Sequence, residues 1–577
     1  MIINFGAKKT FISSKYFSLL LSGTVLMMLT AVMGVVDTLI AGIMLGEYAV
    51  DGVCLVLPLY SFASFIAVIF SYGVPILYAG KMGAYKKEEA DKCFGVGLTM
   101  VSAIGILMFL LFSIGGDAYL KIYHSDARVY SCAAEYLYWV KYVALILPLN
   151  ELFDGILFAD GDEKLSLTAN LIQGITKIFL SVVLCRNIGV KGLAIASFIS
   201  LMVSILISCI HFFSPGNTLK PNIAFSPQIA WDILKYSIVD GSTHLFVSLF
   251  NISINFFVIK SFGFEMLILV SVITLLKEGQ ILFEGIGEAI TPLISTYIGE
   301  ENYPGIKEVW NLAQKSLLAE SLLMMAFAVI GAPFIVSLLG IQNQTTAVYA
   351  IWGLRILSLT LVFTCRLFLD SSYFILVDKI SLGIFDSFLR DLFPAFPLAV
   401  LGGKIGGIYG MFIGLMAAPP IGYLLSVLYI KYKYGSENYP LFLADMEKRK
   451  NVKLFEFEVL PDKIVNTRDE IGKALEANSC NARQIDQVML LFEELFMLIY
   501  DNNPGKTLFA ECMVEIGTTI RLITKDNGKI IDLTDTDQNI TSFRSYILSN
   551  LLEAHTVKRV HFLTLSYNRN IFEIKQM

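Results

Sequence analysis

The sequence predicts an all-α membrane bundle of about twelve transmembrane helices in two six-helix lobes, followed by a small soluble α+β domain. Three observations predict this architecture. Of the 577 residues, 55% are hydrophobic and only 16% are charged, whereas about 25% of the residues of a soluble protein are charged. Residues 436–577 hold 38 of the 93 charged side chains, so the charge density rises sharply near residue 436. The apolar part also repeats itself.

Twelve apolar stretches are long enough to cross a bilayer, which takes about 20 residues. The first begins at Phe17 and is too long for a cleavable signal peptide, so we expect it to remain in the membrane. The expected spans are residues 17–45, 53–80, 93–114, 130–157, 165–185, 190–213, 231–259, 265–298, 310–339, 346–377, 381–401 and 406–431.

Lysines in short loops predict the orientation, because such loops face the cytoplasm. Lys81, Lys86 and Lys87 follow the second span, and Lys431 and Lys433 follow the last. An even number of spans puts both termini on that side. We therefore expect an integral protein of the cytoplasmic (inner) membrane of a bacterium, with both termini cytoplasmic and membrane lipid around its spans.

Charge and cysteine usage exclude some functions. The net charge of −5 gives no reason to expect a nucleic-acid partner. The eight cysteines are scattered without a C-x-x-C pair, so they predict neither a disulfide framework nor a metal site. No cofactor is required by any motif in the apolar part.

Three short matches at nearly the same offset indicate that a six-helix unit is duplicated. Residues 163–167 (Glu-Lys-Leu-Ser-Leu) recur as 378–382 (Asp-Lys-Ile-Ser-Leu). A Gly-x-x-Gly at 189–192 recurs at 407–410, and Pro75 with Gly83 recurs as Pro292 with Gly299. Parallel repeats place the substrate path between the lobes. The expected domains are residues 12–213 and 231–432 for the lobes, 214–230 for the linker between them, and 451–577 for the soluble tail.

Four motifs in this order resemble the multidrug and toxic compound extrusion (MATE) transporters. They are residues 34–42 (Gly-Val-Val-Asp-Thr-Leu-Ile-Ala-Gly), the charged loop at 83–90, residues 158–162 (Phe-Ala-Asp-Gly-Asp) and residues 189–194. The resemblance covers about residues 12–432. It implies efflux of a small-molecule substrate, a drug or organic metabolite, driven by H⁺ or Na⁺ as the two bundles rock.

Asp37 in the first span is the leading candidate for the coupling site. An ionisable residue in a span is costly and usually faces a cavity or a partner. The resemblance implies a cation site for this position, and a structural hydrogen-bond acceptor is the alternative. The family's Asn and Asp in span five fall on Lys177 and Ser181, and its hydroxyl in span six falls on Ser197. An ammonium in place of a metal cation puts Na⁺ coupling at this site in doubt.

The second predicted lobe contains further candidates for coupling. Asp240 and His244 share one helical face at i,i+4, and so do Glu284 and Glu288. The pKa of a histidine lies in the range where proton coupling works. Arg366 and Asp370 have the same spacing, and we interpret these two residues as an internal ion pair.

The tail alternates strand-like and helical patterns, which predicts a compact α+β domain. Residues 488–495 and 524–528 (Thr-Lys-Asp-Asn-Gly) resemble the ATP-binding domain of histidine kinases and of serine-kinase anti-sigma factors. The resemblance implies a role in activating water or orienting Mg²⁺ for Glu494, and adenine binding for Asp526 beside Gly528.

Three departures from that family predict a degenerate, non-catalytic copy. Leu498 stands where the Mg²⁺-binding Asn belongs, and Ile530 replaces the second glycine of the turn. No Gly-x-Gly-Leu lid follows in residues 535–557. An Asp-Asn-Gly turn between two strands is the simpler alternative. We expect the tail to be regulatory, with a regulatory protein as its partner, and ATP binding to be doubtful.

The pattern therefore predicts a secondary active exporter rather than an enzyme. Two alternatives remain open. One is an exporter or flippase of lipid-linked oligosaccharide, for which a basic groove would be expected. The other is a transport-dead membrane sensor that signals through the tail.

Overall fold

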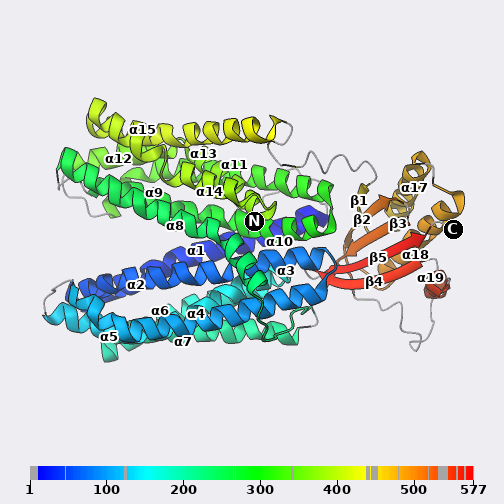
Figure 1. Cartoon of the computed structure of the whole chain (residues 1–577), viewed down its shortest axis with the longest axis horizontal. Coiled ribbons are helices and arrows are strands. Elements are labelled where there is room, and N and C mark those ends of the chain that lie inside the picture. Colours follow the sequence, from blue (N-terminus) through cyan, green and yellow to red (C-terminus); the bar gives the residue numbers. More distant parts are fainter. Residues whose placement is uncertain are drawn as a thin grey trace.

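The computed structural model describes residues 11–575, apart from 46, 123–126, 215, 264–265, 267, 339–343, 437–438, 440–441, 443–451, 479, 518, 530–542, 554–556 and 565–566. Two groups of long helices lie side by side and a small sheet domain lies at one end of them (Figure 1). Among the described residues, nine helices are long and apolar enough to cross a membrane, or ten if one bent pair is counted as a span.

The first group consists of α1 to α7 and a short 3-10 helix. Long apolar runs form the long helices, with Pro148 inside α5, and a break at Tyr72 separates α2 from α3 within the predicted second span. The bounds are α1 Phe11–Leu45, α2 Glu47–Ser71, α3 Gly73–Gly83, α4 Lys87–Ile122, α5 Ala127–Ala159, α6 Glu163–Ile188, α7 Lys191–Ser208 and η1 Cys209–Phe213.

The second group consists of α8 to α15. The predicted eighth span is interrupted by a 3-10 turn, and the predicted tenth bends by 51° between Ser358 and Leu361. The bounds are α8 Pro227–Phe262, α9 Ile268–Gly279, η3 Gln280–Phe283, α10 Glu284–Glu300, α11 Tyr303–Leu338, α12 Gln344–Ser358, α13 Leu361–Leu376, α14 Ile380–Asp391 and α15 Ala395–Tyr434.

The stretch Ile380–Tyr434 is 55 residues long, far more than one membrane crossing requires. It turns back on itself at Gly406 and Gly407, where the backbone leaves the helical region. A Cβ on Gly414 would lie 2.1 Å from the carbonyl oxygen of Leu398, which shows that the chain before the turn lies against the chain after it. Gly407 has φ 60° and ψ −145°, close to the φ 72° and ψ −152° of Gly189. The same turn therefore occurs at the two positions matched by the sequence repeat.

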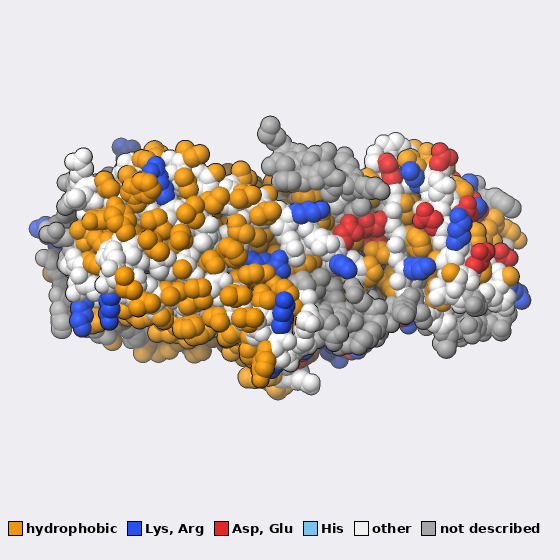
Figure 2. Space-filling view, turned by 90° about the horizontal axis from the view of Figure 1, so that it is seen from above, with side chains coloured by type: hydrophobic (Ala, Val, Ile, Leu, Met, Phe, Trp, Pro, Cys, Tyr) orange, Lys and Arg blue, Asp and Glu red, His pale blue; other side chains and the backbone are white. Residues whose placement is uncertain are grey.

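Exposed apolar side chains cover the helical part of the molecule. They include Leu110, Phe179, Phe256 and Phe327 on four different helices. Figure 2 shows this apolar surface over the bundle and mixed acidic and basic side chains over the sheet domain. Water does not favour such a surface but hydrocarbon does, so the chain is an integral membrane protein.

The two groups of helices meet near the sheet domain and diverge away from it (Figure 1). Glycines allow the closest approach, because a Cβ on Gly83 of α3 would lie 2.2 Å from the carbonyl oxygen of Thr296 on α10. On the other side of this contact, a Cβ on Gly299 would lie 2.2 Å from the carbonyl oxygen of Gly80. Gly83 and Gly299 are the pair matched by the repeat, so equivalent segments of the two units pack against each other.

Helix α1 contributes to both groups. Phe11, Tyr16 and Leu19 lie in a core shared with α10, α11 and α13, whereas Val36 and Ala41 lie in the core of the first group. A division of the chain at residue 213 therefore separates the two units in sequence, while α1 joins them in packing.

The tail forms one five-stranded antiparallel sheet in the order β1-β2-β3-β5-β4. Phe492 and Leu495 of α18 and Phe572 of β5 lie in the core between the helices and one face of the sheet. The other face carries Met513, Ile523 and Ile571, which pack against Tyr85 of the bundle. The bounds are β1 Val452–Glu458, α17 Pro461–Ala477, α18 Ala482–Asp501, β2 Phe509–Ile516, β3 Thr519–Asp526, α19 Phe543–Glu553, β4 Val557–Thr564 and β5 Tyr567–Lys575.

We predict that Gly299→Ala destabilises the protein by weakening the packing of α3 against α10. The added methyl group would meet the backbone of Gly80, which cannot rotate away, and overpacking of this kind costs about 1–3 kcal/mol. Gly115→Ala on α4 is the matched control, because a Cβ there has nothing within 4 Å. The midpoint of thermal unfolding in detergent should fall for Gly299→Ala only. Equal midpoints for both variants would contradict the close packing.

Candidate functional site

Asp37 and Lys177 form a buried ion pair inside the first lobe. Asp37 lies on α1 and Lys177 on α6, and the Lys177 Nζ is 3.6 Å from the Asp37 Oδ1. The two side chains are 8% and 6% exposed. The same ammonium also donates to the carbonyl oxygen of Met33, one turn before Asp37 on α1, at 3.2 Å. Each charge therefore has a partner in a place where an isolated charge would be costly.

Two hydroxyl groups complete the surroundings of the Asp37 carboxylate. The Tyr136 hydroxyl donates to Oδ2 at 2.7 Å, and the Ser197 hydroxyl donates to the same oxygen at 3.3 Å. Ser181 lies one turn further along α6 from Lys177 and is fully buried, and its hydroxyl makes no hydrogen bond with the described residues. Of the four residues expected in this lobe, the structure thus joins Asp37, Lys177 and Ser197 directly.

Tyr136 was not among the candidates, because a tyrosine in an apolar helix gives no signal of its own. The carboxylates of Glu151 and Asp154 on α5 were also missed. Asp154 accepts hydrogen bonds from Asn170 at 2.8 Å and from Asn150 at 3.2 Å. Among the described residues, no side chain donates to Glu151. Two acids three residues apart within an apolar run were the signal that could have found them.

Glu151 and the ion pair have Tyr60 as a common neighbour. Tyr60 of α2 is within electrostatic reach of Lys177, Asp37 and Glu151 together. The first lobe therefore contains three carboxylates and one ammonium in a single region, contributed by α1, α5 and α6.

The candidates expected in the second lobe lie on α8 and α10. The side chains of Asp240 and His244, both on α8, lie outside the described residues. Glu284 is exposed and Glu288 is half-buried on α10. A Cβ on Gly23 of α1 would lie 3.3 Å from the Glu288 Cβ, so Glu288 faces α1. The structure thus places Glu288 at the contact of α10 with α1.

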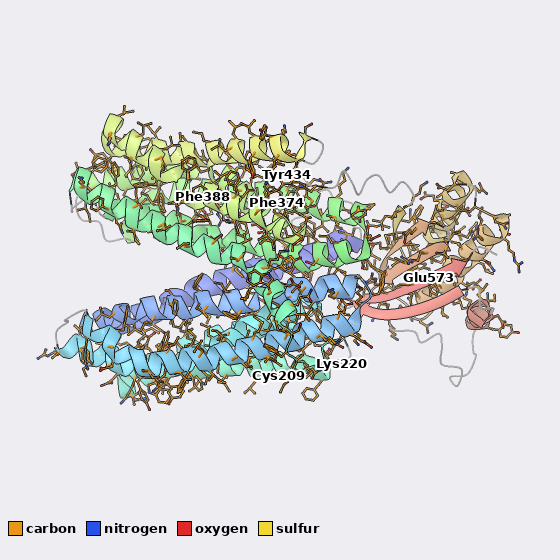
Figure 3. The ribbon with its side chains drawn as sticks, viewed as in Figure 1. Cys209, Lys220, Phe374, Phe388, Tyr434 and Glu573 are labelled. Carbon is orange, nitrogen blue, oxygen red and sulfur yellow. The ribbon has the colours of Figure 1, made fainter. Side chains whose placement is uncertain are left out.

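Other charged residues of the second lobe are paired with one another. The expected pair is present, with Arg366 Nε 3.0 Å from an Asp370 oxygen. Arg390 donates to its neighbour Asp391 at 2.7 Å, and the Lys277 ammonium donates to the Asp391 carbonyl oxygen at 3.1 Å. The side chains around this region, including Phe374 and Phe388, are shown in Figure 3.

In the tail, Glu494 and Asp526 already have protein partners. Arg544 of α19 lies 3.2 Å from the Glu494 carboxylate. Asp526 is 1% exposed and accepts hydrogen bonds at 2.9 Å from both the backbone N–H of Gly528 and the Asn568 amide. Burial raises the pKa of Asp526 to about 6. The segment where a lid would be expected, residues 535–557, lies partly outside the described residues.

Comparisons with known proteins agree with the fold of the helical part. Residues 24–183 match the family model MatE. The fold is similar to "Crystal structure of MATE in the bent conformation", with a TM-score of 0.66 and 20% identity over 76% of this chain and 96% of that one. It is also similar to "Outward-facing conformation of a multidrug resistance MATE family transporter of the MOP superfamily", with a TM-score of 0.65 and 22% identity over 72% of this chain and 96% of that one.

A third structure comes from Pyrococcus furiosus, "Reverse polarity of binding pocket suggests different function of a MOP superfamily transporter". Its TM-score is 0.66 at 20% identity, over 73% of this chain and 96% of that one. No curated protein matches the chain in sequence. The solved chains are covered almost completely, so about a quarter of this chain has no counterpart in them.

These findings define the class. The chain is an integral membrane protein with the fold of the MATE transporters, and residues 24–183 carry a MATE family domain. The likeness of the tail to ATP-binding domains stays a prediction. Two features of this particular chain matter for its function: the ammonium of Lys177 beside Asp37, and the sheet domain attached after α15.

We predict that Lys177→Met destabilises the protein because it leaves the Asp37 carboxylate buried without a cation. Breaking a buried pair from one side costs about 3–5 kcal/mol. The double variant Asp37→Asn with Lys177→Met should recover most of that loss, since no charge then remains. Thermal unfolding in detergent measures both. A double variant no more stable than Lys177→Met would show that the two side chains are not coupled.

We also predict that the purified full-length protein hydrolyses no ATP. The structure gives Glu494 an arginine partner, and Leu498 cannot bind Mg²⁺. Phosphate release with ATP and Mg²⁺ should equal that of Glu494→Ala. Turnover that disappears in Glu494→Ala would contradict the prediction, and binding of ATP without turnover would agree with it.

Proposed function

We propose that this protein is a secondary active exporter of drugs or organic metabolites in a bacterial cytoplasmic membrane. It crosses the membrane twelve times and works by alternating access between its two lobes. The MATE-type fold and the MATE family domain support transport as the general function. The tail acts as a regulatory domain on the cytoplasmic side.

The Asp37–Lys177 pair is the observation that carries the choice of coupling ion. The Lys177 ammonium is buried, and its Nζ lies 3.6 Å from the Asp37 Oδ1, so it already neutralises the carboxylate. Sodium would have to displace this ammonium, which would leave a second cation buried beside it. We therefore propose that the first lobe does not bind Na⁺ and that protons drive transport.

Protons have groups to occupy in the same lobe. Glu151 is a half-buried carboxylate that accepts no hydrogen bond from the described residues, and Tyr60 is within electrostatic reach of both Glu151 and the pair. Glu151 and Asp154 thus offer a proton-binding group and a negative surface for a cationic substrate.

The orientation follows from the lysine-rich loops. Lys15 of α1 lies over the ring of Tyr567 of the tail, and Tyr85 in the lysine-rich α3–α4 turn lies against Arg569, so both segments lie at the tail end of the molecule. In Figure 3, Lys220 of the linker between the lobes is labelled near that end as well. Under the positive-inside rule this end is cytoplasmic. The lobes meet there, so the structure corresponds to a state closed toward the cytoplasm.

A transport-dead sensor is the second candidate. The contact of the tail with both lobes favours it, because such a contact would pass a change in the bundle to the tail. Substrate flux separates the two functions, since a sensor moves no substrate.

We predict that a cationic fluorescent dye is exported from proteoliposomes under a proton gradient, and that Na⁺ at constant ionic strength and pH does not change the rate. Lys177→Asn should make the rate depend on Na⁺, because it removes the ammonium and adds an amide oxygen as a ligand. Lys164→Asn is the matched control on the same helix, where the side chain is exposed.

The outcome separates the alternatives. If the unmodified protein needs Na⁺ and Asp37→Asn removes that need, Lys177 does not replace the cation. If no condition produces flux in a protein that is correctly inserted, the sensor function is favoured over export.

A further inference from the structure

Four charged side chains are buried together where the tail meets the two lobes. The tail contributes Glu511 on β2, Lys525 on β3 and Arg569 on β5, and the bundle contributes Glu300 at the end of α10. Each of these residues is at most 5% exposed. We call these four residues the junction cluster. Two positive and two negative charges balance, and every one of them has an ionic partner within 3.2 Å.

Arg569 contacts both lobes with one guanidinium group. Its Nη1 donates to the carbonyl oxygen of Met82 at 3.2 Å and its Nη2 to that of Gly83 at 2.9 Å, at the C-terminal end of α3. The same Nη2 lies 3.2 Å from Glu300 of α10 in the second lobe. The ring of Tyr85 lies against the guanidinium at 3.8 Å. A cation is favourable at a helix C-terminus, where carbonyl groups are without helical partners.

The other members of the cluster connect the tail to the second lobe. Lys525 lies 2.5 Å from Glu300 and 3.0 Å from Glu511. Glu511 also accepts hydrogen bonds from Asn302 at 2.8 Å and from Tyr297 at 3.4 Å. All of these bundle residues belong to α10 and the turn that follows it. The tail is also attached covalently to the second lobe, since it follows α15.

The tail also makes an aromatic contact with α1, near Lys15, which pairs with Glu163 of α6 in the first lobe. Tyr567 packs against Phe11 with the ring centroids 4.5 Å apart. Phe11 lies in the part of α1 that packs into the core shared with α10 and α11. The link from the tail to the end of α3 in the first lobe therefore depends on Arg569 and its platform Tyr85, together with the apolar contact around Met513.

We propose that the tail is a conformational clamp, which stays with the second lobe and keeps the first lobe closed against it through Arg569. The cytoplasmic ends of α3 and α10 then separate only after the Arg569 guanidinium leaves the carbonyl groups of α3. Separation leaves Arg569 with Glu300, so its charge remains paired and the movement does not expose an isolated buried charge. The inference rests on the proposed alternating access.

Distances between nitroxide labels test the clamp in the full-length protein. We place the labels at Glu88→Cys on α4 and Lys307→Cys on α11, both exposed positions near the junction, in a chain whose eight native cysteines are replaced. The unmodified protein should give one short distance. Arg569→Gln should add a second, longer distance with at least a tenfold increase in its population.

Two further variants make the result specific. Tyr85→Asn removes the aromatic platform but retains a residue that accepts the positive φ of 64° at this position, and it leaves every residue of the tail in place. It should also add the longer distance. Arg468→Gln is the matched control, because Arg468 lies on α17 and its ion pairs in the described contacts are with Asp469 and Glu493 of the tail.

The measurement does not depend on flux, so it is separate from the test of the exporter function. A longer distance in Arg569→Gln and Tyr85→Asn, with Arg468→Gln equal to the parent, supports the clamp. If Arg569→Gln fails to fold, Tyr85→Asn decides by the same criterion. A single short distance in Tyr85→Asn, or equal populations of both distances in the parent, would overturn the proposal.

Discussion

The close contact of α3 with α10 is the constraint on which the rest of the structure depends. Glycine at positions 83 and 299 lets the two backbones approach to distances that no Cβ would allow. Inside a membrane, association of helices relies on such packing, because lipid tails solvate apolar side chains as well as a neighbouring helix does. The contact brings the ends of both repeat units together, and these ends form the surface on which the tail sits.

This surface explains why the tail sheet has two unlike faces. Side chains alternate between the faces of a strand. Lys525 therefore faces the bundle, and its neighbour Asp526 faces the other way, toward the Gly528 turn. The same alternation holds for Arg569 and Asn568 on the paired strand. Asp526 is bonded directly to Lys525, and Asn568 directly to Arg569. A movement of the Gly528 turn would therefore be passed to the junction cluster across one peptide bond on each strand.

Charge neutralisation within the protein is common to both ends of the molecule. In the first lobe the Lys177 ammonium lies beside the Asp37 carboxylate, at the position where the MATE resemblance implies a cation site. At the junction, two cations from the tail neutralise carboxylates of the bundle and of the tail itself. A buried ion pair stabilises an arrangement of helices only while both of its partners are in contact. The Asp37–Lys177 pair and the junction cluster are therefore suited to segments that move relative to each other.

Composition and periodicity by themselves determined the membrane bundle, the change to a soluble tail and the internal repeat, because hydrophobic length and charge density act locally along the chain. Motif order also led to Asp37, Lys177 and Ser197. The tertiary structure alone decided that Tyr136 donates to Asp37, and that Tyr60 lies within electrostatic reach of both Glu151 and the Asp37–Lys177 pair. It also decided that half of α1 packs with the second unit, and that Arg569 reaches residues almost 490 positions earlier in the chain. These contacts join residues far apart in sequence, and their positions depend on how whole helices pack, which no local pattern records.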